Sequence, residues 1–108
     1  LESVQTILAT ALEAVTEATE WVAENAGDMP AVLAGAMAYL DMLAITTGGQ
    51  VLADGAVAAR SLGVDAATER ALLARFFAAN RLAGVPGKLP AVIAGSADLA
   101  LARATILR

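Results

Sequence analysis

The chain has 108 residues, a formal net charge of −4 and a hydrophobic content of 58%, with aromatic residues at only 4%. It contains no Cys and no His, which excludes disulfides, thiolate nucleophiles, a His general base and the usual zinc sites. The length allows one domain with a single core, the net acidity argues against non-specific nucleic-acid binding, and the Ala-rich composition favours helix.

Residues 1–26 are predicted to form an amphipathic surface helix. An apolar stripe and a row of glutamates repeat at the same spacing on two different faces. Trp21 widens the apolar stripe and is interpreted as a core or interface residue. Gly27 is expected to end this helix in the left-handed conformation, and Asp28 is expected to cap the next helix. The stripe holds Leu1, Val4, Leu8, Ala11, Val15, Ala18 and Val22, and the row holds Glu13, Glu17, Glu20 and Glu24.

The next segment, Met29–Ser61, is predicted to be one long helix at the centre of the fold. Tyr39 is interpreted as a core or interface residue. Gly48 and Gly49 each cost helix stability, so we expect a neighbouring helix to approach closely there, with a kink as the alternative. A stripe in steps of three and four is expected to be buried; it holds Leu33, Met37, Leu40, Ala44, Gly48, Val51, Gly55 and Ala58.

A third helix is predicted to start near Ala66, after a stop at Gly63 and a cap at Asp65. Its bulky side chains are expected to pack on the small-residue stripe of the central helix, while the arginines lie off that face. The bulky residues are Leu72, Leu73, Phe76, Phe77, Leu82 and Val85, and the arginines are Arg70, Arg75 and Arg81.

A break or sharp kink is predicted at residues 84–87, because Pro86 lacks a backbone N–H and its ring clashes with the preceding turn. A further helix is expected from Leu89, with a possible interruption at Gly95 and Ser96. The fold class is therefore all-α. We expect an antiparallel up-down bundle of three long helices plus a shorter, kinked C-terminal helix, forming a single domain over residues 1–108.

Three features bear on the setting of the domain. Asp41 interrupts the most apolar window and leaves runs too short to cross a bilayer, so we expect no transmembrane segment. Asp41 itself is expected to pair with Arg75 or Arg81, or to lie exposed at an edge; a buried functional carboxylate is the alternative. Because the sequence starts at Leu1, we expect a fragment or a processed chain. The absence of Cys fits a cytoplasmic origin.

No residue pattern points to catalysis. Residues 47–50 (TGGQ) lack a phosphate-loop pattern and are interpreted as close helix packing. The glutamate row is interpreted as a solvated face. Gly87 and Lys88 with Arg81 offer an anion site near a helix start as a weaker alternative. We therefore predict no catalytic, cofactor-binding or metal-binding residue in this chain.

The order of the segments resembles the extra C-terminal helical domain of many bacterial acyl-CoA dehydrogenases, including those for methylmercaptopropionyl-CoA. The likeness covers about residues 1–101. Gln50 departs from it, because an aromatic residue is commoner there, and Phe77 stands where the family usually has Tyr. Pro86 also falls later than the family's proline. The matching pieces are TEWV with Asn25 (19–25), AGAMAYL (34–40), TGGQVLA (47–53), ARFFA (74–78) and AGSAD (94–98).

The resemblance implies an FAD-dependent parent enzyme that removes hydrogens α and β to an acyl-CoA thioester. The general base and the flavin would lie in preceding domains, called here the catalytic body. The fragment itself would be a non-catalytic helical cover that packs on this body and aids assembly, with self-association as a homo-oligomer. The interface candidates are Trp21, Tyr39, Gly48, Gly49, Arg75, Phe76 and Phe77.

Two alternatives of other classes remain open from the residues alone. An independent helical module would bind a partner helix in a groove and would need no catalytic body. A membrane-associated helical hairpin would partition into detergent. A dehydrogenase body encoded directly upstream in the same reading frame would favour the dehydrogenase domain over the independent helical module.

Overall fold

The computed structural model describes residues 1–106, and these residues form helices joined by short turns, which confirms the all-α class. Five α-helices and three 3-10 turns follow one another along the chain. They are α1 (Glu2–Glu24), α2 (Met29–Ala34), α3 (Ala36–Ala58), η1 (Ala59–Leu62), α4 (Val64–Asn80), η2 (Leu82–Gly84), η3 (Pro86–Lys88) and α5 (Leu89–Ile106).

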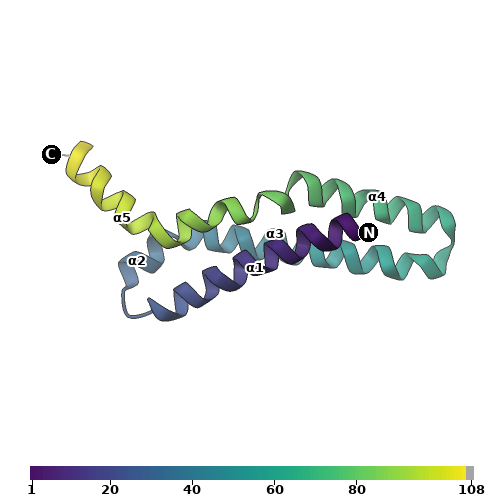
Figure 1. Ribbon diagram of the computed structural model, residues 1–108, viewed down its shortest axis with the longest axis horizontal. Helices are drawn as coiled ribbons and strands as arrows, with labels where there is room; N and C mark the ends of the chain where they lie inside the picture. The colour runs from purple at the N-terminus through teal and green to yellow at the C-terminus, as the bar shows by residue number, and fades with distance from the viewer. Residues whose placement is uncertain (107–108) are drawn as a thin grey trace.

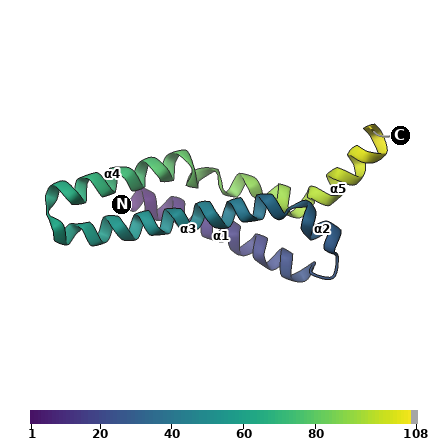
Figure 2. The ribbon, with the colours of Figure 1, turned by 180° about the vertical axis from the view of Figure 1, so that it is seen from behind.

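The molecule is a long, thin slab of two helical layers. Helices α3 and α4 run side by side as a hairpin, and α5 prolongs the line of α4 (Figure 1). Helix α1 covers one side of this hairpin and stops short of the α3–α4 turn, whereas Figure 2 shows α3 and α4 unobstructed from the other side. The Cα extents are 62 × 26 × 16 Å and the radius of gyration is 17.5 Å, against about 13 Å for a compact domain of this length.

The core lies between α1 and the hairpin, and small residues supply much of it. Ala11 and Ala18 of α1 are fully buried, and Ala74 and Ala78 are the buried residues of α4. Small side chains let the helix axes approach closely, so little bulk is needed to fill the space between them. The largest fully buried side chains are Met42, Leu82, Val4, Val85 and Val92.

The surface helix predicted over residues 1–26 is confirmed in its orientation, and it spans Glu2–Glu24. Helix α1 buries the apolar stripe and leaves the glutamate row exposed. Its end differs from the prediction, because Gly27 does not adopt a positive φ. Instead Asn25 terminates the helix, with both its backbone N–H and its side-chain Nδ2 donating to the Trp21 carbonyl at 3.0 and 2.8 Å.

The single helix predicted over Met29–Ser61 is wrong, because the chain breaks at Gly35 into α2 and α3. Gly35 packs against the backbone of α5: a Cβ on it would lie 2.7 Å from both the Cα and the carbonyl oxygen of Val92. The cap at Asp28 is confirmed, since its Oδ1 accepts from the Ala31 N–H at 3.3 Å. The break thus turns α2 across the start of α5.

The stripe of α3 predicted to be buried lies mostly on the surface instead. Met37, Leu40 and Val51 are 73%, 56% and 63% exposed. The buried row runs through Met42, Ile45 and Gly49, on the opposite side of the helix. Both rows are apolar, so hydrophobicity alone did not fix the phase of the helix, and the expected burial of this stripe was wrong.

Helix α4 begins and ends differently from the prediction. Gly63 does stop the preceding turn, with φ +115°, but it is also the N-cap of α4, and Asp65 makes no capping hydrogen bond. The expected packing of the bulky row is wrong for Leu72, Leu73 and Phe76, which are exposed. Phe77 is half-buried and does pack against the core.

The break around Pro86 is confirmed as the two 3-10 turns η2 and η3, and it carries the fully buried Leu82 and Val85. Helix α5 is not the shorter C-terminal helix that was expected, since its 18 residues exceed the 17 of α4. The segment Ala97–Ile106 is inclined by 63° to the segment Val64–Gly95, so the interruption expected at Gly95 and Ser96 is confirmed.

Within residues 1–106, one helix is long and apolar enough to cross a membrane by length and composition, and the bent pair Val64–Gly95 and Ala97–Ile106 passes the same test together. The single helix is Ala36–Leu62, with a mean hydropathy of 1.2 over its most apolar window, of which 33% is buried in this fold. The core helix of a water-soluble protein satisfies the same criterion, so the finding carries little weight by itself.

Candidate docking surfaces

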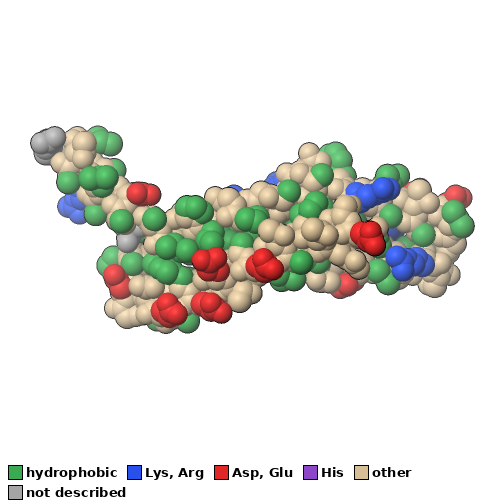
Figure 3. Space-filling view, in the orientation of Figure 1, with side chains coloured by type: hydrophobic (Ala, Val, Ile, Leu, Met, Phe, Trp, Pro, Cys, Tyr) green, Lys and Arg blue, Asp and Glu red, His purple; other side chains and the backbone are tan. Residues whose placement is uncertain are grey.

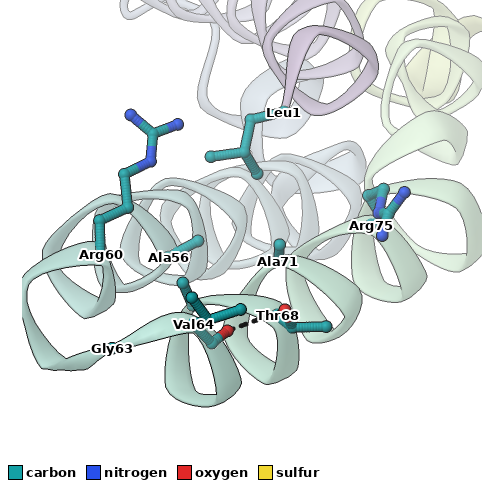
Figure 4. A pocket seen from close by; sticks show the side chains of 9 residues that line it. Leu1, Ala56, Arg60, Gly63, Val64, Thr68, Ala71 and Arg75 are labelled. Atoms are coloured by element: carbon teal, nitrogen blue, oxygen red, sulfur yellow. Dashed lines mark hydrogen bonds between the residues drawn. The ribbon is translucent and has the colours of Figure 1, made fainter.

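A groove lies at the end of the hairpin, just beyond the first residue of α1. We call it the tip groove (Figure 4). Small side chains from α3 and α4, among them Ala56, Ala67 and Ala71, form much of its lining. Its volume is about 490 Å³, and it is lined by Leu1, Ala56, Arg60, Gly63, Val64, Ala67, Thr68, Ala71 and Arg75.

Two guanidinium groups flank this groove from different helices, Arg60 from the end of α3 and Arg75 from α4 (Figure 4). Both residues are exposed. Within residues 1–106 the one ion pair joins Lys88 to Asp41, so neither arginine is neutralised there. The Thr68 hydroxyl donates to the Val64 carbonyl at 2.8 Å and is therefore already engaged. The groove thus offers an apolar floor with positive charge at its rim.

The charge of the molecule is divided along its length. Residues 1–59 carry −8 and residues 60–108 carry +4. In Figure 3 acidic side chains follow α1 toward α2, while the hairpin end shows both basic and acidic side chains. The tip groove therefore has the positively charged Arg60 and Arg75 at its rim, although the net charge of the chain is negative.

A second surface is the side of the hairpin that turns away from α1. We call it the open face, and define it by Met37, Leu40, Ala44 and Val51 of α3 with Leu73 and Phe76 of α4. Gly48 lies one turn from Ala44 on α3, and Phe77 lies one turn from Leu73 on α4. A Cβ on Gly48 would lie 3.3 Å from Phe77 Cζ, so the two helices approach each other closely at this point. No helix covers this side in Figure 2.

The close approach expected at Gly48 and Gly49 is confirmed. Gly49 is buried against Leu82, where a Cβ would come within 2.9 Å of a methyl carbon. Two further glycines of this kind, Gly35 and Gly95, were missed. A Cβ on Gly95 would lie 3.3 Å from the Ala34 carbonyl oxygen, so both glycines serve the same crossing of α2 and α5. Each belongs to a family-like segment, 34–40 or 94–98, which was the available signal.

The remaining interface candidates lie in different places. Trp21 and Tyr39 are half-buried against the core, and the Tyr39 hydroxyl lies 2.7 Å from Thr19 Oγ1 on α1. Arg75 lines the tip groove, and Phe76 belongs to the open face at 69% exposed. The structure does not bring these residues into one site.

The expectation for Asp41 is half right. Asp41 is exposed at the edge of the bundle, but its partner is Lys88 rather than Arg75 or Arg81. The Lys88 Nζ lies 3.8 Å from Asp41 Oδ2, and both side chains are more than a third exposed. An ion pair this exposed contributes little to stability.

Two candidate ligand sites, the glycine pair and the acidic side chains, can be checked within the described residues. Gly48 and Gly49 face Phe77 and Leu82, so this glycine pair does not form a phosphate cradle. Among residues 1–106 no three acidic residues are placed to hold a metal ion. The tip groove offers alkyl groups and two guanidiniums, which can bind a partner but do not supply a general base.

The sequence was compared with known families and proteins. Residues 1–102 match the family described as acetyl-CoA dehydrogenase C-terminal like. The chain belongs to this family. No curated protein and no solved structure matches it. The family match confirms the resemblance that the five sequence segments indicated. The tip groove and the open face are the two surfaces of this domain that could bind a partner.

Proposed function

We propose that this chain is a non-catalytic C-terminal helical domain of an FAD-dependent acyl-CoA dehydrogenase, which packs on the catalytic body and aids assembly of the enzyme. The family match over residues 1–102 carries the proposal. The parent would hold FAD in the body, would act on acyl-CoA thioesters and would be cytoplasmic.

The tip groove supports docking on the body. In the proposed parent the body precedes Leu1, and Leu1 itself lines the groove, so the body arrives at this side of the molecule. Carboxylates of the body would pair with Arg60 and Arg75, while an apolar side chain would fill the floor between them. Pairs formed by arginine with carboxylates are directional and gain strength when a partner excludes water.

The test uses the parent enzyme with both groove arginines reversed, Arg60→Glu and Arg75→Glu. We expect the domain to detach, so that limited proteolysis releases it at least about tenfold faster, which corresponds to about 1.4 kcal/mol of docking. The flavin absorbance and the turnover of a series of saturated acyl-CoA thioesters should be retained. Arg70→Glu is the matched control, because Arg70 is exposed outside the groove.

Two results would contradict this function. Loss of flavin in the groove variant, with helicity intact by circular dichroism, would mean that the domain contributes to the cofactor site. A reading frame without a dehydrogenase body upstream would favour the alternative, an independent helical module that binds a partner helix. The tip groove gives that alternative a specific site, since its apolar floor and basic rim suit an acidic amphipathic helix.

A further inference from the structure

We infer that the tip groove continues the surface on which α1 packs, and that in the parent enzyme the segment directly before Leu1 extends α1 as a helix along this groove. The inference rests on the proposed function, in which the parent chain continues upstream of Leu1, and it names the part of the body that docks there. Body and domain would then be joined by one continuous helix rather than by a flexible linker.

The row of small side chains on α4 beneath α1 runs on into the groove. Its members follow one another in steps of four, three and four residues and so lie on one face of α4: Ala78, Ala74, Ala71 and Ala67. Ala78 and Ala74 are 1% and 2% exposed and belong to the core that α1 covers. Ala71 and Ala67 line the groove and are half-buried. The packing surface therefore extends beyond the first residue of α1.

Helix α1 runs antiparallel to α3 in a constant register as far as the groove. At one end the Tyr39 hydroxyl lies 2.7 Å from Thr19 Oγ1. At the other end Leu1 and Ala56 line the same groove, so 18 residue steps of α1 span the same length as 17 steps of α3. Figure 1 shows the axis of α1 pointing along the hairpin toward its turn. Further helical residues before Leu1 would follow this line into the groove.

Neither the backbone nor the side chain of Leu1 signals the start of a helix. The Leu1 carbonyl accepts a hydrogen bond from the Gln5 N–H at 2.9 Å, which is the helical pattern. Leucine is a poor N-cap residue, and the N-cap of α1 makes no side-chain hydrogen bond. In Figure 4 the Leu1 side chain points toward the hairpin floor around Ala56 and Ala71. The helical backbone and the apolar stripe thus both reach Leu1 without a stop signal.

The apolar stripe of α1 predicts the pattern of the residues upstream. Leu8, Val4 and Leu1 are separated by steps of four and three, which match the first two steps of the alanine row on α4. The next step of that row is four residues, so we expect apolar residues at the fourth and then at the seventh position before Leu1. The groove follows α4 from Ala71 to Val64, about 10 Å or two helical turns, which an extension of seven residues covers.

Charge complementarity favours the same occupant. Helix α1 carries five glutamates and no basic residue. The groove rim carries Arg60 and Arg75, and neither arginine forms an ion pair within residues 1–106. A helix that continues the character of α1, with apolar side chains toward the hairpin and carboxylates on its flanks, would match both the floor and the rim.

The experiment is disulfide cross-linking in the parent enzyme, with the cysteines of the body replaced. The domain itself contains no cysteine. One cysteine is placed four residues before Leu1, and the second is introduced in the groove by Ala67→Cys. A disulfide requires Cα atoms within about 7 Å, so this pair should close under mild oxidation at least about tenfold faster than a control pair. Peptide mapping by mass spectrometry measures closure.

The control pair keeps the upstream cysteine and replaces Ala67→Cys with Glu69→Cys. Glu69 is exposed and lies two residues further along α4, about 200° around the helix. Equal closure of the two pairs, or closure of neither, would overturn the inference. A cross-link of twice the chain mass would also overturn it, because a second copy would then fill the groove. A proline among the three residues before Leu1 would do the same, since it breaks the continuous helix.

Failure of this inference and failure of the proposed function give different results. If the double variant Arg60→Glu and Arg75→Glu releases the domain faster but the Ala67→Cys pair does not close, the docking stands and the continuous helix is wrong. If the pair closes in a parent chain whose upstream part is not a dehydrogenase, the continuous helix stands and the proposed function is wrong.

Discussion

Glycines decide the closest contacts of this fold, and they are not equivalent. Gly48 faces the end of a phenylalanine ring that can turn aside, whereas Gly35 faces the Val92 backbone, which cannot move without shifting α5. Gly55 lies in the interior of α3 with nothing near the position of a Cβ. The same residue type is therefore required at one position and costly at another.

Gly35→Ala should destabilise the chain by more than about 2 kcal/mol, because overpacking against a rigid backbone displaces a whole helix. Gly55→Ala should instead stabilise it by up to about 1 kcal/mol through helix propensity. Urea denaturation followed by circular dichroism measures both. Equal effects of the two substitutions would contradict the helix crossing at Gly35.

At the scale of elements, the break after α4 holds larger fully buried side chains than the helix before it. Helix α4 buries only Ala74 and Ala78, while Leu82 and Val85 in the following turns are fully buried. A 3-10 turn changes which way successive side chains point, so these residues reach the core although they lie beyond the helix.

Leu82→Ala should cost about 2–5 kcal/mol, the range for removing a buried leucine side chain and leaving a cavity. Leu72→Ala should be close to neutral, because Leu72 is 54% exposed on α4. Thermal unfolding of the two variants gives the comparison. A larger loss for Leu72→Ala would mean that the exposed row of α4 carries the core after all.

Local features of the helices could be predicted from the sequence, whereas the way the helices pack could not. The helical class, the surface helix α1, the cap at Asp28 and the stop at Gly63 follow from local chemistry, and all are confirmed. The phase of α3 could not be predicted, because Leu40 and Met42 are both apolar and only the position of α1 selects between them. Gly35 and Gly95 were missed for a related reason: their partners are distant in sequence.

The sequence predicted some residues of the tip groove and the open face, but not how these residues are grouped. Arg75, Phe76 and Phe77 were selected together as interface candidates, yet they separate into the tip groove, the open face and the edge of the core. Residues adjacent in a helix point in directions about 100° apart, so a run of interesting residues seldom forms one site. Arg60 joins Arg75 only through the α3–α4 turn, which no local pattern reveals.

At the scale of the whole molecule, the two broad sides of the slab differ in chemical character. Helix α1 occupies one side of the hairpin with its glutamates outward, and the opposite side is apolar and uncovered.

The short reach of α1 has a consequence for local stability. Beyond Leu1 the hairpin end consists of two helices with no third helix over them, and few large side chains are buried there. Backbone amides near Val57 and Ala67 should therefore exchange with deuterium through local opening, well before those near Met42, which need global unfolding. Attachment of the catalytic body at this end should slow their exchange selectively, so the exchange pattern would reveal whether the domain is docked or free.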